Sequence, residues 1–157
     1  MALTITSGPW TADQAEDFLS RTVIPVRLAS IRKGSDGQPW PVVQSLWFTY
    51  RHQSLWCATQ ASSGLVARLR QQAAVGFEIS RDEPPYCGVR GTGQAEVLTD
   101  AADLLAELIS RYGQMDTALA SWLLSRVDRE VAIRIGDLKV STWDYAARMQ
   151  VPGGLAH

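Results

Sequence analysis

Six short segments rich in apolar, β-branched and aromatic residues restrict the fold of this chain more than any other feature. They cover residues 26–32, 41–50, 55–59, 73–80, 89–98 and 130–135. Residues of this kind favour strands, and the sequence KGSDGQ between the first two segments carries the Gly and Asp signals of a tight turn. Strands joined by such turns run antiparallel, so the sequence predicts a mainly β protein.

About four short helices are predicted around these strands. They are expected after the capping box formed by Thr11 and Gln14, after Ser62 or Ser63, after a cap at Asp100, and over residues 117–126. A doubly wound parallel sheet needs a helix after nearly every strand, and this chain lacks that alternation. An antiparallel barrel fits better, because closure removes the exposed edges of short strands.

The chain is expected to form one domain over residues 1–157, with a helical segment at 1–22 and a flexible tail at 150–157. Within 130–135 the residues alternate, which predicts that Val131, Ile133 and Ile135 are buried and that the opposite face is exposed. Residues 140–149 are expected to add a short strand or a cover over the barrel mouth.

Composition and charge exclude several classes of partner. Fifteen basic and sixteen acidic residues give a formal charge of -1, so neither a nucleic acid nor an acidic membrane is expected to bind. Cys57 and Cys87 form no CxxC pair, which predicts two free thiols. No segment approaches the ~20 apolar residues of a membrane span, and no secretory leader is evident, so we expect a cytoplasmic protein.

The residues that could carry catalysis are few. His52 and His157 have no His or Cys at metal-ligand spacing, so no metal site is expected. No serine lies in a G-x-S-x-G elbow. The stretch RGTGQAE at 90–96 lacks the third glycine of a dinucleotide fingerprint and continues into a strand, so Gly91 and Gly93 are interpreted as marks of a β-bulge. The six tryptophans are expected in the core and at a subunit interface.

The order of these segments resembles the pyridoxamine phosphate oxidase-like split-barrel flavoproteins. The resemblance runs from IPVRLASIRKGSDGQPWPVVQSLWF through LWCATQASSGLVARLRQQAAVGFEI to PPYCGVRGTGQAEVL, roughly residues 24–98, and VAIRIGDLKVSTWD matches the closing strand. It implies a six-stranded antiparallel split barrel and a homodimer that holds one FMN in each of two clefts between the subunits. No pattern for true pyridoxamine phosphate oxidase activity follows Trp143.

The resemblance also implies cofactor-binding residues. They lie on the first strand, at a possible ring contact, and around the start of the second helix: Arg27, Leu28, Ala29, Arg32, Trp47, Ala58, Thr59, Ser62, Ser63, Gly64 and Leu65. In the oxidases an Arg and, five residues later, a Lys help to hold the flavin phosphate, and Arg27 and Arg32 occupy those positions. Both are cationic, as a phosphate dianion requires. Trp47, Trp56 and Trp143 are candidates to border the flavin ring.

One departure from the family pattern concerns the phosphate. Gly64 and Leu65 stand where the family has Arg and Lys after the serine that Ser63 matches. A helix start still attracts an anion through its free N–H groups and its dipole. Two fixed charges are absent, however, which predicts weaker flavin binding unless Arg68 or Arg70 substitutes for them.

The function predicted from the resemblance is an FMN-dependent oxidoreductase that acts on a small molecule. A deazaflavin is the alternative cofactor, and haem is less favoured. A non-catalytic flavin or haem binder and a cofactor-free dimeric barrel remain alternatives, because no catalytic residues are identified. Gly64 and Leu65 favour these two alternatives, whereas Arg27 and Arg32 favour the enzyme.

Overall fold

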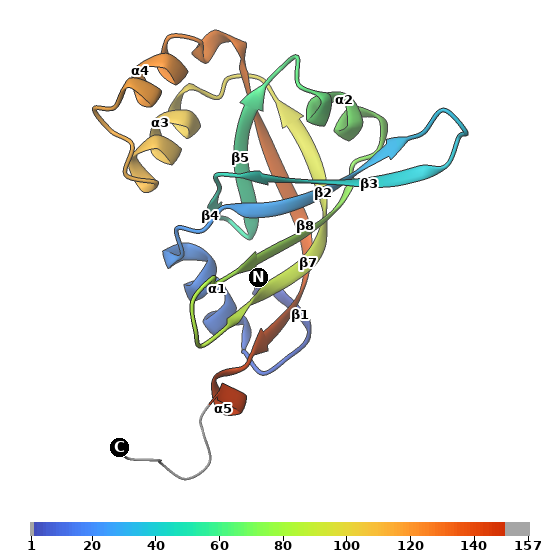
Figure 1. Ribbon diagram of the computed structural model, residues 1–157, viewed down its shortest axis with the longest axis vertical. Coiled ribbons are helices and arrows are strands. Elements are labelled where there is room, and N and C mark those ends of the chain that lie inside the picture. Colours follow the sequence, from blue (N-terminus) through green and yellow to red (C-terminus); the bar gives the residue numbers. More distant parts are fainter. Residues whose placement is uncertain (1, 150–157) are drawn as a thin grey trace.

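The computed structural model describes residues 2–149 as one eight-stranded sheet with helices around it (Figure 1). The strands are β1 (Thr4–Ser7), β2 (Val26–Lys33), β3 (Pro39–Leu46), β4 (Thr49–Arg51), β5 (Ser54–Gln60), β6 (Ala74–Ser80), β7 (Cys87–Leu98) and β8 (Glu130–Asp144). The helices are α1 (Ala12–Arg21), α2 (Gly64–Gln71), α3 (Ala102–Arg111), α4 (Ala118–Leu124), the 3-10 helix η1 (Val127–Arg129) and α5 (Ala146–Met149). None of the helices in this part of the chain is both long and apolar enough to cross a membrane. The predicted tail at 150–157 lies outside the described residues.

The strands follow the order β3-β2-β6-β7-β8-β5-β4, and β1 pairs with β8. Every pairing is antiparallel except that of β1 with β8, which is parallel. The mainly antiparallel β architecture with flanking helices agrees with the prediction. The strand count differs from the six that were expected, and no pairing within residues 2–149 joins β3 to β4 and closes the sheet.

One predicted strand is split in two by helix α3. Residues 41–50 form β3 and β4, with a break at Trp47 and Phe48. The N–H of Phe48 donates to the hydroxyl of Tyr112 at 3.2 Å, and the indole of Trp47 stacks on the Tyr112 ring with centroids 5.1 Å apart. Tyr112 follows the last residue of α3, so tertiary contacts with this helix end β3 and start a new strand.

Strand β8 is longer than the alternation over 130–135 predicts, and it agrees with the closing strand that the resemblance implies over 131–144. Residues 130–135 and the following segment form one strand of 15 residues, and Asp137 within it adopts a φ of +52°. The register between β7 and β8 shifts between Thr92 and Gln94, so Gly93 lies in the expected bulge. Gly91 instead pairs regularly with Val140.

Two caps test the helix predictions. The capping box of α1 is confirmed, because Gln14 N–H donates to the Thr11 hydroxyl and Thr11 N–H donates to the Gln14 side chain. The predicted cap of α3 is wrong by one residue. The cap position is Ala101, and Asp100, at a φ of +66°, accepts a bond from the N–H of Ala102.

The hydrophobic core lies inside the curved sheet and is mainly aliphatic. Its largest fully buried members include Leu19, Leu28, Phe48, Leu55, Ile133 and Ile135. A second apolar layer packs α3 and α4 on the other face of β5 and β8. The tryptophans do not fill the core, contrary to the prediction: Trp40 and Trp122 are exposed, and the other four are half-buried. Cys57 and Cys87 are free thiols, as predicted.

Candidate functional site

Most of the predicted site residues with accessible side chains fall into three separate regions. The first, which we name the α2 cradle, consists of Ser62, Ser63, Gly64 and Arg68 at the start of α2. The Ser63 hydroxyl caps this helix by accepting from the N–H of Val66 at 3.3 Å. Ser62 and Gly64 are exposed, and Thr59 is half-buried near the end of β5. The early N–H groups of α2 therefore lie at the surface, where an anion can reach them.

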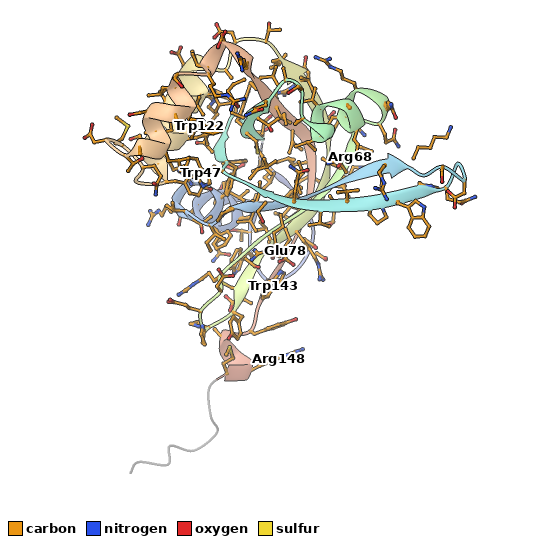
Figure 2. All side chains as sticks on the ribbon, turned by 45° about the horizontal axis from the view of Figure 1, so that its top comes forward. Trp47, Arg68, Glu78, Trp122, Trp143 and Arg148 are labelled. Atoms are coloured by element: carbon orange, nitrogen blue, oxygen red, sulfur yellow. The ribbon has the colours of Figure 1, made fainter. Side chains whose placement is uncertain are left out.

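Arg68 completes the α2 cradle. Its Nε donates to the hydroxyl of Ser30 at 2.8 Å, and its Nη2 donates to Oε1 of Gln44 at 2.8 Å. A Cβ placed on Gly64 would lie 3.1 Å from Nη1 of Arg68. The guanidinium thus lies beside Gly64 at the start of the helix (Figure 2). Of the two arginines predicted as substitutes, Arg68 occupies this position, whereas Arg70 is exposed near the other end of α2.

Arg27 and Arg32 lie on opposite faces of β2. Successive side chains of a strand alternate between faces, and β2 pairs regularly with β3 along its whole length. Ser30 and Arg32 therefore share the face that meets α2, while Arg27 and Ala29 share the other. Arg32 is exposed near the β2–β3 turn, beside Asp36 and Trp40. The structure thus separates the two arginines that the resemblance had placed on one phosphate.

The second region is a groove of about 740 Å³ on the outer face of the sheet, named the outer groove. It is lined by Thr6, Arg27, Ala29, Val43, Gly76, Phe77, Glu78, Arg90, Gly91, Thr92, Lys139 and Ser141.

Charged and small residues form two rows across the strands of the outer groove. Cross-strand pairing aligns Arg27 with Glu78 and Glu78 with Arg90, so the charges alternate along one row. The neighbouring row aligns Ala29 with Gly76 and leaves the backbone close to the surface. Arg27 also lies 3.5 Å from Oδ1 of Asp82, with both side chains well exposed. Such a surface ion pair leaves the arginine available to a ligand.

The third region is a pocket of about 280 Å³ between the sheet and helices α3 and α4, named the Glu130 pocket. It is lined by Ser45, Leu46, Trp47, Ala58, Leu105, Leu108, Leu119, Leu123 and Glu130. Trp47 and Ala58 of the predicted site therefore lie here, away from Arg27. One face of the Trp47 ring is already taken by Tyr112.

Two predicted residues contribute no accessible side chain. Leu28 is fully buried and Leu65 is almost so, and both belong to the hydrophobic core. Trp56 and Trp143 lie in neither groove nor pocket: Trp56 is covered by the Arg51 guanidinium, and Trp143 packs against Tyr145.

Sequence reasoning missed Ser30, Gln44 and Glu130. Ser30 and Gln44 are ordinary strand residues, and only the packing of α2 on β2 reveals that they orient Arg68. Glu130 is buried although its position was predicted to face solvent. One signal in the sequence could have indicated its burial: Glu130 begins an apolar strand and follows two apolar helices that could cover it.

Several solved structures share this fold. The chain is similar to a conserved hypothetical protein of Mycobacterium tuberculosis, with 23% identity, a TM-score of 0.71, and coverage of 98% of this chain and 99% of that one. It is also similar to an F420 reductase (21%, TM-score 0.57, 76% of this chain and 90% of that one). A Listeria innocua protein assigned as a pyridoxamine 5'-phosphate oxidase is a third (15%, TM-score 0.59, 82% and 95%). No family model and no curated protein matches the sequence.

Proposed function

We propose that this protein binds a phosphate-bearing flavin, FMN in the first place, and acts as a flavin-type oxidoreductase on a small molecule. The observation that carries the proposal is the position of the Arg68 guanidinium beside Gly64. Gly64 and Leu65 stand where the family has Arg and Lys. The guanidinium of Arg68, one turn later in α2, lies where a side chain at residue 64 would begin.

The residues of the α2 cradle fit a phosphate group. The exposed start of α2 offers N–H donors and the positive end of the helix dipole. Ser62 adds a hydroxyl, and Arg68 adds a guanidinium whose Nε and Nη2 are already held by Ser30 and Gln44. Arg32 lies on the same face of β2 as Ser30, two residues further toward the β2–β3 turn. Charge-assisted hydrogen bonds of this kind contribute about 1.5–3 kcal/mol each.

The flavin supplies hydride transfer when it is bound, and the protein supplies position and electrostatics. This division of labour suits a site without a catalytic dyad. A deazaflavin is the alternative, since one similar structure is an F420 reductase and a phosphate cradle suits that cofactor equally. Haem is disfavoured, because the one histidine within residues 2–149 is His52, which lies in the turn between β4 and β5 and lines neither the outer groove nor the Glu130 pocket.

A second copy of the chain is part of the proposal. The outer groove is wide and shallow, with a floor of small residues that include Ala29 and Gly76, and the exposed side chains of Trp40 and Val43 lie on the adjoining hairpin. Homodimers typically bury apolar surface of this kind. Pairing through this face would convert the outer groove into a cleft between subunits, in which Arg27 and Arg90 would be available to the ligand.

The proposal is tested by titrating the cofactor-free protein with FMN and following the quenching of flavin fluorescence, with riboflavin as the phosphate-free comparison. We expect saturable FMN binding, which Arg68→Ala weakens about 10- to 150-fold, the equivalent of one charge-assisted bond. Arg70→Ala, which removes an exposed charge from the same helix, is the matched control and should change affinity less than twofold. Failure to bind FMN would overturn the FMN assignment, and equal losses in both variants would overturn the α2 cradle.

A further inference from the structure

The Glu130 pocket combines an apolar wall with a single buried acid. Leucines from β3, α3 and α4 form most of the wall, and the indole of Trp47 and the methyl group of Ala58 complete it. Trp47 and Trp122 of α4 lie on the same side of the molecule (Figure 2). The pocket is on the outer side of β5, because Ala58 packs with α3 while its neighbour Cys57 packs in the core. It is therefore separate from the α2 cradle.

Glu130 is the one ionisable residue in the lining of this pocket. It is the first residue of β8, pairs with Gln60 of β5, and is only 8% exposed. Within residues 2–149 its carboxylate has no ion-pair partner within 4 Å, and neither of its oxygens is both fully buried and without a hydrogen-bond partner. Burial raises the pKa of Glu130, and the positive charge of Arg126 partly opposes that shift. The Arg126 guanidinium is directed elsewhere, because it lies over the Trp122 ring at 4.7 Å.

Burial removes part of the water around a carboxylate, so a charged donor that enters the pocket beside Glu130 would stabilise it. An apolar pocket with one well-placed polar group is also the usual design of a small-molecule site, with the polar group fixing the ligand's orientation. The carboxylate favours a ligand with a hydrogen-bond donor, and the walls favour a ligand with an apolar body. A volume of about 280 Å³ limits that body to about one ring with a short side chain.

We propose that the Glu130 pocket binds a small apolar amine, whose ammonium group donates to the Glu130 carboxylate while its hydrocarbon part packs against Trp47 and the leucines. An amine suits the site better than an acid, since the acceptor is anionic when ionised and a carboxylate ligand would be repelled. Leu119 of α4 lines the pocket yet is 43% exposed, so the entrance lies along this short helix. The inference does not depend on flavin binding.

The proposal is tested with 2-phenylethylamine as the probe and phenylacetate as its anionic counterpart. Binding is measured by isothermal titration calorimetry and by quenching of tryptophan fluorescence on the full chain. We expect the amine to bind at least tenfold more tightly than phenylacetate. Glu130→Gln should weaken amine binding about tenfold or more, as expected when a hydrogen bond to a charged group is lost.

Two further variants separate the pocket from the fold and from the flavin proposal. Ala58→Leu fills the pocket but keeps the acid, so it should also abolish amine binding. Glu96→Gln, a matched change at an exposed glutamate on the paired strand β7, should leave amine binding intact, as should Arg68→Ala. Equal affinity for the amine and phenylacetate, no amine binding at millimolar concentration, or unchanged binding in Glu130→Gln and Ala58→Leu would each overturn the proposal.

Discussion

Arg68 and Ser30 are joined by a 2.8 Å hydrogen bond from the guanidinium Nε to the serine hydroxyl. Ser30 is fully buried, so this bond holds the arginine from the side of the protein interior. Gln44 of β3 accepts a second bond from Nη2. The guanidinium is thereby held at the start of α2 before any ligand arrives. An anion that binds there has less side-chain entropy to overcome than it would with a freely moving arginine.

Ser30→Ala should weaken FMN binding while Arg68 itself remains in place. Without the hydroxyl the guanidinium is held only by Gln44, so we expect a loss of about three- to tenfold in FMN affinity and about 1 kcal/mol in the free energy of unfolding. Riboflavin affinity should not change, because riboflavin lacks the phosphate. Fluorescence titrations with both flavins and urea unfolding measure these effects. An equal loss for riboflavin would mean that Ser30 acts only through general stability.

Val43→Glu should disrupt the proposed dimer. Val43 is 64% exposed on β3 and lines the outer groove, so a carboxylate there would be buried between two copies without a partner. Val23→Glu is the control, since Val23 is 50% exposed but lies before β2 and outside the outer groove. Light scattering after size-exclusion chromatography should show dimers for the parent chain and Val23→Glu, and monomers for Val43→Glu. A parent chain that is monomeric at every concentration contradicts the dimer.

Local signals were sufficient for most of the elements, and tertiary contacts account for the rest. The capping box at Thr11 and the serine cap at Ser63 depend on neighbouring residues, so the sequence predicted them well. The alternation ends at Ile135, but Gly136 still pairs with Gln94. Asp137 and Leu138 then lie opposite Gly93 as an irregularity, and β8 continues. No local pattern indicates that outcome, because it depends on the pairing with β7.

The site was harder to predict than the fold, because it depends on which face each side chain takes. Arg32 follows Arg27 by five positions, and this odd spacing alone places them on opposite faces of a regular strand. Glu130 was predicted to face solvent, since strand alternation does not show that α3 and α4 cover that face. Which of Arg68 and Arg70 lies beside Gly64 could not be predicted before the packing of α2 on β2 was known.

Arg111→Lys should destabilise the protein without altering either proposed site. The Arg111 guanidinium donates to three carbonyl oxygens at the end of α1, those of Leu19, Ser20 and Thr22, at 2.6–3.2 Å. A lysine cannot reproduce this fork, so we expect the free energy of unfolding to fall by about 1.5–3 kcal/mol. Arg21→Lys, at an exposed i,i+4 pair with Asp17, should cost less than about 0.5 kcal/mol. Urea denaturation of both variants measures these losses. Equal losses would contradict a stabilising role for the hydrogen bonds from Arg111 to the end of α1.

Glu130→Gln should stabilise the protein at neutral pH and much less so in acid. Burial raises the pKa of Glu130, so the folded state binds a proton at this site more tightly than the unfolded state does. The contribution of Glu130 to stability therefore falls as the pH rises from the ordinary carboxyl pKa through the raised value, and the full penalty of the buried charge is present above it. Glutamine carries no charge, so the difference in unfolding free energy between the variant and the parent should grow from about pH 4 to about pH 8. Urea unfolding across this range measures that difference, with Glu96→Gln as the exposed control. A constant difference would show that Glu130 is no harder to ionise in the folded protein, and that its carboxylate already has a donor.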